Sequence, residues 1–182
     1  MPSLVNAETD ERDALLAFLA AQRGGLRRAV LGLSEEQAAG TPTVSSLSLA
    51  VLIKHAARCE RFWITENLLQ QGGGEESASM ERWADEYRLV EGDTLAGWLA
   101  VYEQVAAETE KAVRELPSLE VDFPLPVAPW FPPNSRRTAR WALLHLIQET
   151  ARHAGHADII RETVDGKVAF QLLAEEQGTP WN

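Results

Sequence analysis

The sequence predicts an all-α protein, a four-helix bundle in which a long proline-rich crossover precedes the last helix. Apolar residues recur at spacings of three and four in four long segments, which is typical of amphipathic helices. Stretches containing glycine and proline separate these segments, and strand-like alternation is confined to the short run 121–125. Because 182 residues is a usual length for one domain, we expect a single bundle domain over residues 1–182.

The first expected helix covers about residues 9–33. The pair of glycines at 24 and 25 weakens it by about 1 kcal/mol each relative to alanine, so a bend or a close helix contact is expected there. A connector follows over about 34–47, in which Ser34 and Gln37 have the spacing of a capping box. The apolar positions of the helix are Leu15, Leu19, Leu26, Val30 and Leu33.

The second expected helix covers about 48–70 and carries His55 within its apolar face. The glycines at 72–74 are expected to end it, and the polar stretch 75–91 is expected to be a loop. Asp93 is the expected N-cap of a third helix, because aspartate accepts hydrogen bonds from free amide groups at a helix start. This helix should stop at Pro117.

Six prolines lie between residues 117 and 134, so this segment cannot be a regular helix. Its apolar side chains argue against a solvated linker, and we expect a crossover that packs on the domain. Ser135 is the expected cap of the last helix, which should span about 137–164 and end at Asp165 and Gly166. The apolar residues of the crossover are Leu119, Val121, Phe123, Leu125, Val127, Trp130 and Phe131.

The charge balance argues against nucleic acid as a partner, because 17 Lys and Arg face 27 Asp and Glu, a formal charge of -10. The single cysteine, Cys59, cannot form an internal disulfide, and the amino terminus has no signal-peptide pattern. We therefore expect a reduced, cytoplasmic protein. No apolar run approaches the roughly 18 residues of a membrane span, so no membrane partner is expected. Whether the chain forms a homodimer is left open.

Histidine carries the strongest functional signal. His145, His153 and His156 lie within twelve residues of the last helix, in one row with Glu149. His145 and His153 are separated by about 12 Å along the helix, whereas metal–nitrogen bonds are about 2.0 to 2.1 Å, so they cannot share one ion. The chelating pairs that stay open are His145 with Glu149, Glu149 with His153, and His153 with His156. A further ligand must come from another helix, where His55 is the only histidine.

A metal site is one of two interpretations of this row, since an isolated helical histidine is usually a satisfied polar group or a surface residue. Glu149, if it faces inward among imidazoles, needs a cation, because an unpaired buried carboxylate costs several kcal/mol. Histidine with carboxylate suits zinc, nickel or iron(II), and three protein ligands would leave positions for water or substrate. Cys59, one turn after His55, is expected to be a small core residue instead of a ligand.

Two stretches carry a family resemblance: HAARCERFW at 55–63 and LLHLIQETARHAGHADIIRETVDG at 143–166. They resemble the DinB/YfiT-like superfamily, especially its actinobacterial branch of mini-circle-type proteins. The resemblance implies an up-up-down-down four-helix bundle that holds a divalent metal. It implies His55, Glu149 and His153 as the metal ligands. His156 falls where many relatives have glutamine, so the resemblance places it at the pocket rim or directly behind the ligands instead of at the metal.

Glutamate at 149 makes the implied ligand set similar to that of the mycothiol-dependent maleylpyruvate isomerases. The resemblance therefore implies a divalent-metal-dependent transferase of small molecules that activates a low-molecular-weight thiol such as mycothiol. A metal-dependent hydrolase with the same site is an alternative. A noncatalytic bundle that binds a metal or a small ligand is another.

Overall fold

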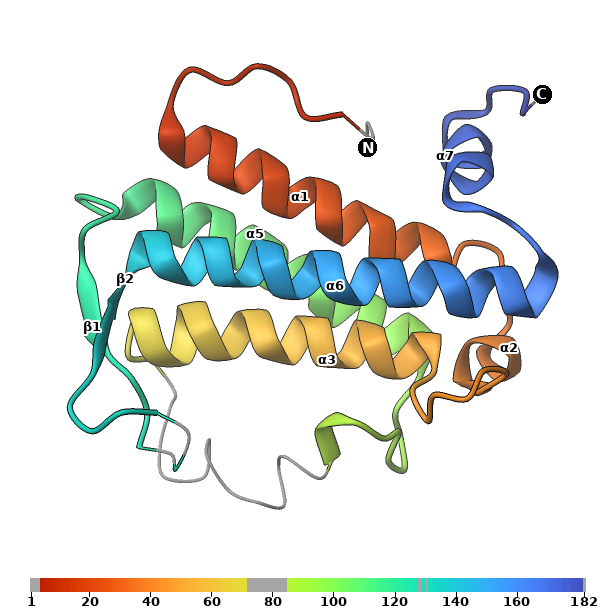
Figure 1. The fold of residues 1–182 in the computed structure, drawn as a ribbon, viewed down its shortest axis with the longest axis horizontal. Coiled ribbons are helices and arrows are strands. Elements are labelled where there is room, and N and C mark those ends of the chain that lie inside the picture. Colours follow the sequence, from red (N-terminus) through yellow and green to blue (C-terminus); the bar gives the residue numbers. More distant parts are fainter. Residues whose placement is uncertain (1–3, 72–84, 128, 130, 182) are drawn as a thin grey trace.

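The computed structural model describes residues 4–71, 85–127, 129 and 131–181. Figure 1 shows four long helices lying side by side, as the sequence predicts. The second helix changes from α-helical to π-helical hydrogen bonding in its last two turns. The expected glycine end at 72–74 lies outside the described residues. The long helices are α1 (Glu11–Ala29), α3 (Leu49–Arg61) continued by η1 (Phe62–Leu68), α5 (Leu95–Glu115) and α6 (Ala139–Asp165).

The helix directions correct one expectation. Helices α1 and α6 run one way and α3 and α5 run the other way, so the chain order is up, down, down, up (Figure 1). The up-up-down-down order that the resemblance implies is wrong for this chain. The connector after α1 stays at one end of the bundle, so α3 turns back along it. Helix α5 begins at the end of the bundle opposite to the end where η1 stops. Helix α1 packs along α6, and α3 packs along α5.

Two of the expected helix caps are wrong. The N-cap of α5 is Thr94, whose side chain accepts a hydrogen bond from the amide of Gly97, whereas the carboxylate of Asp93 is bound by Lys54. The N-cap of α6 is Thr138 and not Ser135. Residues 136–138 pair as a strand, so the helix cannot begin before residue 139.

The proline-rich connection packs on the bundle, as expected from its apolar residues. It joins the ends of α5 and α6 at the same end of the bundle (Figure 1). Strand β1 (Asp122–Pro124) pairs there with β2 (Arg136–Thr138) in antiparallel register, with Phe123 opposite Arg137. Phe123 is 1% exposed and anchors the strand pair to the core. Trp130 lies outside the described residues.

Two short helices flank the bundle. The predicted capping box begins α2 (Glu35–Ala39), where the side chains of Ser34 and Gln37 each accept from the other residue's amide. Helix α7 (Ala169–Gln177) is not expected from the sequence, and it packs against α1. Gly166 ends α6 with a φ of 77°, which lets the chain turn toward α7. None of the described helices is long and apolar enough to cross a membrane.

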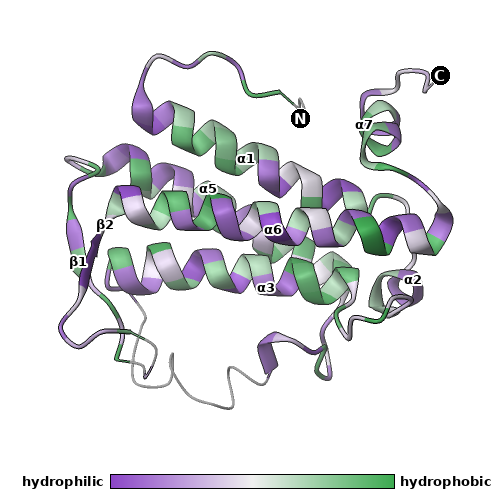
Figure 2. Ribbon diagram, viewed as in Figure 1, coloured by the Kyte–Doolittle hydropathy of each residue, from purple (hydrophilic) through white to green (hydrophobic). Residues whose placement is uncertain are grey.

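The interior is divided into two apolar clusters. Along the long helices, apolar and polar residues alternate (Figure 2). One cluster lies around Ile53 and Ile160, and the other around Trp63 and Leu143. On each long helix, a buried polar residue lies between the fully buried members of one cluster and those of the other. We call these four residues the polar layer: Arg23, Glu60, Thr109 and Thr150.

Two residues of the polar layer form a buried ion pair. Arg23 donates to both carboxylate oxygens of Glu60, from Nη2 at 2.6 Å and from Nε at 3.0 Å. The two side chains are 3% and 2% exposed. The metal-site candidate Glu149 precedes Thr150 of the same layer, so the candidate site lies at mid-height in the bundle.

Candidate metal centre

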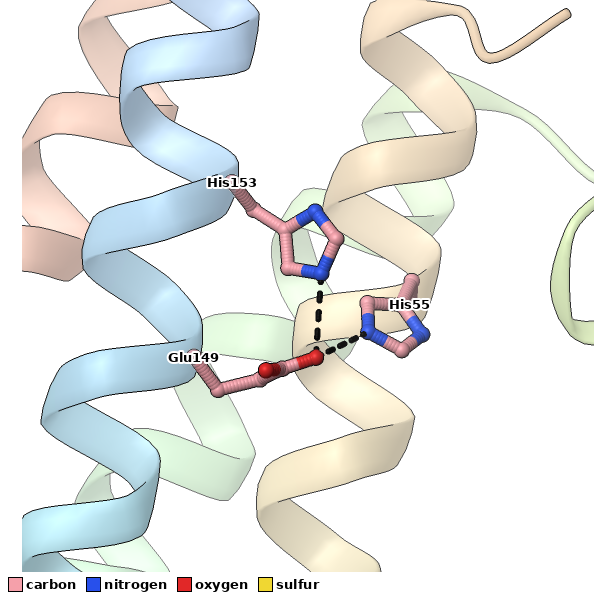
Figure 3. Close-up of side chains that lie close together, drawn as sticks. All are labelled: His55, Glu149 and His153. Atoms are coloured by element: carbon pink, nitrogen blue, oxygen red, sulfur yellow. Dashed lines mark hydrogen bonds and ion pairs between the residues drawn. The ribbon is translucent and has the colours of Figure 1, made fainter.

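Two facing helices position the three predicted ligands. His55 lies on α3, and Glu149 and His153 lie one turn apart on α6, so their side chains leave the same helix face. Figure 3 shows the three side chains converging between these two helices, with both imidazoles directed at the carboxylate of Glu149. Chain positions that are 94 residues apart thereby meet.

The donor atoms lie close enough to share one ion. His153 Nε2 is 3.1 Å from Glu149 Oε1, and His55 Nε2 is 3.4 Å from the same oxygen. One donor atom from each residue lies within 4.8 Å of the other two. The two imidazole rings meet edge to face, with centroids 4.6 Å apart. Of the pairs that spacing alone leaves open, the structure brings Glu149 and His153 together with His55.

The spacing and chemistry of the donors fit a divalent ion. For bonds of about 2.0 to 2.2 Å and angles of roughly 90 to 109° between them, adjacent donors lie about 2.8 to 3.6 Å apart. Both distances to Glu149 fall in this range. Two imidazoles with one carboxylate form a donor set that suits zinc, nickel or iron(II).

Burial and neighbouring charges shift the pKa values of His55 and Glu149. Burial alone would lower the pKa of His55, but hydrogen bonds to Glu149 and Glu86 outweigh it and raise the pKa to about 9. Hydrogen bonds from His153 and His55 hold the pKa of Glu149 far below its usual range, against the opposing effect of burial. The carboxylates of Glu149 and Glu86 are therefore stabilised by a positive charge between them, either a proton on His55 or a bound cation.

Two residues next to the site are missed by the sequence reasoning. Glu86 Oε1 lies 2.9 Å from His55 Nδ1, on the side of the ring that faces away from Glu149. Tyr87 stacks on the same imidazole, with ring centroids 5.1 Å apart and planes at 27°, and it is 42% exposed. Residues 75–91 are rich in acids, and no spacing distinguishes Glu86 from the others, so the sequence holds no signal for this contact.

The two remaining histidines stand apart from the donor group. His145 stacks on Trp141, with centroids 5.0 Å apart and planes at 3°, and meets the edge of Trp63 at 4.9 Å. Burial lowers its pKa, and the nearby Glu149 opposes this effect. His156 is half-buried and makes no hydrogen bond to any of the described residues. Its place at the rim of a pocket stays a prediction.

Cys59 also stays outside the donor group. Its side chain packs against the apolar cluster around Trp63, as expected for a small core residue. Burial raises the pKa of the Cys59 thiol, and the negative charges of Glu149 and Glu86 raise it further. The thiol is therefore neutral at physiological pH and a poor nucleophile.

Comparisons with known proteins bear on the fold and on the family of the chain. A solved structure, described as a conserved protein of Enterococcus faecalis, is similar to this chain with a TM-score of 0.58 at 16% identity. The match covers 88% of this chain and 100% of the other, and it shows a shared fold. No match is found among curated proteins. The family mycothiol-S-transferase matches residues 14–166, which include all three donors. The chain therefore belongs to the mycothiol-S-transferase family, within the DinB/YfiT-like proteins that its sequence resembles.

Proposed function

We propose that the protein is a divalent-metal-dependent transferase that joins mycothiol, or a similar low-molecular-weight thiol, through its sulfur to an electrophilic small molecule. The thiol gives up its proton, its sulfur bonds to the electrophilic carbon, and the leaving group of the acceptor departs with the displaced electron pair. The observation that carries the proposal is the convergence of His55, Glu149 and His153 from two helices in a member of this family. We place the reaction in the cytoplasm, where small thiols are kept reduced.

The three residues would hold the ion through His55 Nε2, His153 Nε2 and Glu149 Oε1. A divalent cation lowers the pKa of a bound thiol or water, and so supplies a nucleophile at neutral pH. Three protein donors are also the number found in catalytic zinc sites, which keep a position for water or substrate. The carboxylate of Glu149 balances part of the positive charge of the ion. This ligand set would therefore stabilise a bound thiolate less strongly than a set of three neutral imidazoles.

Residues next to the donors supply surfaces for the reactants. Tyr87 covers one face of His55 and is partly exposed, so it offers a ring edge and a hydroxyl to a bound molecule. His145 lies one turn and Trp141 two turns before Glu149 on α6, and their stacked rings continue the face of the helix that carries the donors. These groups would bind and orient the thiol and its acceptor.

A conjugation assay on protein purified without a histidine tag tests the proposal. Mycothiol and a fluorogenic alkylating agent are mixed with zinc-loaded and chelator-treated protein, and loss of free thiol is followed. We expect conjugation above the uncatalysed rate only in the metal-loaded sample. The variant His153→Ala should lose both bound metal and activity, whereas its neighbour His156→Ala should keep the metal.

Three outcomes would contradict the proposal in different ways. Equal activity with and without metal would remove the ion from the mechanism. Ester or amide hydrolysis without thiol consumption would favour the hydrolase alternative. Full metal loading with no reaction of any thiol tested would favour a noncatalytic binding bundle.

A further inference from the structure

Glu86 makes a contact that a metal-binding histidine requires. An imidazole that binds an ion through Nε2 must carry its proton on Nδ1, and an acceptor beside Nδ1 selects that tautomer. In this structure, Glu86 Oε1 lies 2.9 Å from His55 Nδ1, and the Glu86 side chain is 16% exposed. His153 has no such support, because its Nδ1 is buried without a hydrogen-bond partner among the described residues.

A buried lysine ties the segment that carries Glu86 to α3. Lys54, which precedes His55, is 1% exposed, and its Nζ donates to Asp93 Oδ2 at 2.7 Å and to the carbonyl of Arg88 at 3.0 Å. The ammonium also lies 5.5 Å from the ring centroid of Trp98. A buried ammonium without such partners would destabilise the folded protein. Lys54 can therefore be buried only when this segment is docked, and the docked segment is in turn held by Lys54.

The acceptor of this lysine is fixed in turn. Asp93 accepts from the backbone amide of Val90 through Oδ2 and from Trp98 Nε1 through Oδ1, both at 2.9 Å. The segment from residue 88 to residue 93 is therefore held at two points by one side chain of α3. Glu86 lies only two residues before the first of these points, which limits how far its carboxylate can move from His55.

We propose that Glu86 is a positioning residue for the metal ligand His55, and that a clamp of Lys54 and Asp93 holds Glu86 in place. This inference deepens the proposed function and rests on the metal site proposed above. Lys54 and His55, which are adjacent on α3, then have complementary roles. His55 supplies a donor atom, and Lys54 anchors the segment that orients this donor.

The dissociation constant of zinc, measured by chelator competition on the full chain at pH 7.5, tests the role of Glu86. Glu86→Ala should weaken zinc binding by about 10- to 100-fold, the usual effect of removing a partner of a metal-bound histidine. Glu86→Gln keeps a carbonyl acceptor and should lose less. Glu91→Gln, at an exposed glutamate of the same segment, is the matched control and should bind zinc like the wild type.

The NMR signal of the His55 side chain provides a readout that a general loss of stability would not change. In the zinc-loaded wild type, the Nδ1 proton of His55 should resonate downfield, as expected for a proton bonded to a carboxylate. It should move upfield in Glu86→Ala, while the signals of His153 stay in place.

The clamp is tested by a double-mutant cycle. Lys54→Met should weaken zinc binding in the wild-type background and should have little further effect in Glu86→Ala, because it acts through Glu86. Asp93→Asn is a milder second variant if Lys54→Met does not fold, which circular dichroism reports. Additive losses would overturn the clamp.

The outcomes separate this inference from the proposed function. If the wild type binds zinc through His55 and Glu86→Ala binds it equally well with an unchanged Nδ1 signal, the role of Glu86 is overturned and the metal site stands. If the wild type binds no zinc, both fall together.

Discussion

Replacing Glu60 with leucine should lower the free energy of unfolding by about 3 to 5 kcal/mol, because it leaves the charge of Arg23 buried without its main partner. The magnitude follows from the geometry of the polar layer. Two hydrogen bonds, at 2.6 and 3.0 Å, join side chains that are 3% and 2% exposed. The one other acceptor of Arg23 among the described residues is Glu110, at 3.2 Å with a side chain 41% exposed, and it reaches only Nη1.

The companion changes complete a thermodynamic cycle. Arg23→Met should cost a similar amount, because it leaves the carboxylate of Glu60 buried beside Tyr102. The double variant Arg23→Met with Glu60→Leu removes both charges and should recover most of the loss, since apolar pairs of similar volume commonly replace buried ion pairs at little cost. The coupling energy should therefore be about 3 kcal/mol or more.

Equilibrium unfolding in urea, followed by circular dichroism on metal-free protein, measures all four members of the cycle. A matched control is Glu110→Gln, which removes only the partly exposed partner and should cost less than about 1 kcal/mol. Two results would refute the reasoning. One is a loss below 1 kcal/mol in Glu60→Leu, and the other is a double variant whose loss equals the sum of the single losses.

Three further predictions concern the site and the core. The metal-free protein should lose up to about 3 kcal/mol of stability as the pH rises from 6.5 to above 9. The folded state binds the proton of His55 more tightly than the unfolded state, because the pKa of His55 is raised to about 9. The full stabilisation is therefore present below pH 6.5, and it is lost as the pH rises through about 9. Urea unfolding across this range tests it, and a His55→Gln variant with the same slope would disprove the assignment. Phe123→Ala should cost about 3 to 5 kcal/mol in the same assay, because the ring is 1% exposed, whereas truncation of the exposed Val127 should cost little. Cys59 should react with a disulfide reagent far more slowly in the native protein than after unfolding, and equal rates would contradict its partial burial and the raised pKa of its thiol.

The sequence was sufficient for those parts of the fold and site that depend on local spacing. Helical periodicity predicts all four long helices, and the four-residue spacing of Glu149 and His153 allows them to meet at one ion. Spacing also allows two other pairs on this helix, and only the family resemblance selects Glu149 and His153 together with His55. The assignment of these residues to a metal stays a prediction.

The parts that the sequence misses depend on distant contacts. Asp93 and Thr94 are comparable caps, and the choice between them is made by Lys54, 39 residues away. Glu86 belongs to an acid-rich loop without periodicity, so only the docked structure distinguishes it. Helix direction is set by which end of the bundle each connection reaches, which residue spacing does not encode.

The polar layer has a mechanical consequence for the bundle. Close-packed interiors transmit strain from one side chain to the next, because neighbouring atoms are in van der Waals contact. At Arg23 and Glu60, this continuity between apolar side chains is interrupted by groups that directional bonds hold in place. The layer is therefore a boundary within the interior, at which apolar contacts give way to directional bonds. We expect a change of side-chain size near Trp63 to disturb the packing around Leu143 more than the packing around Ile53.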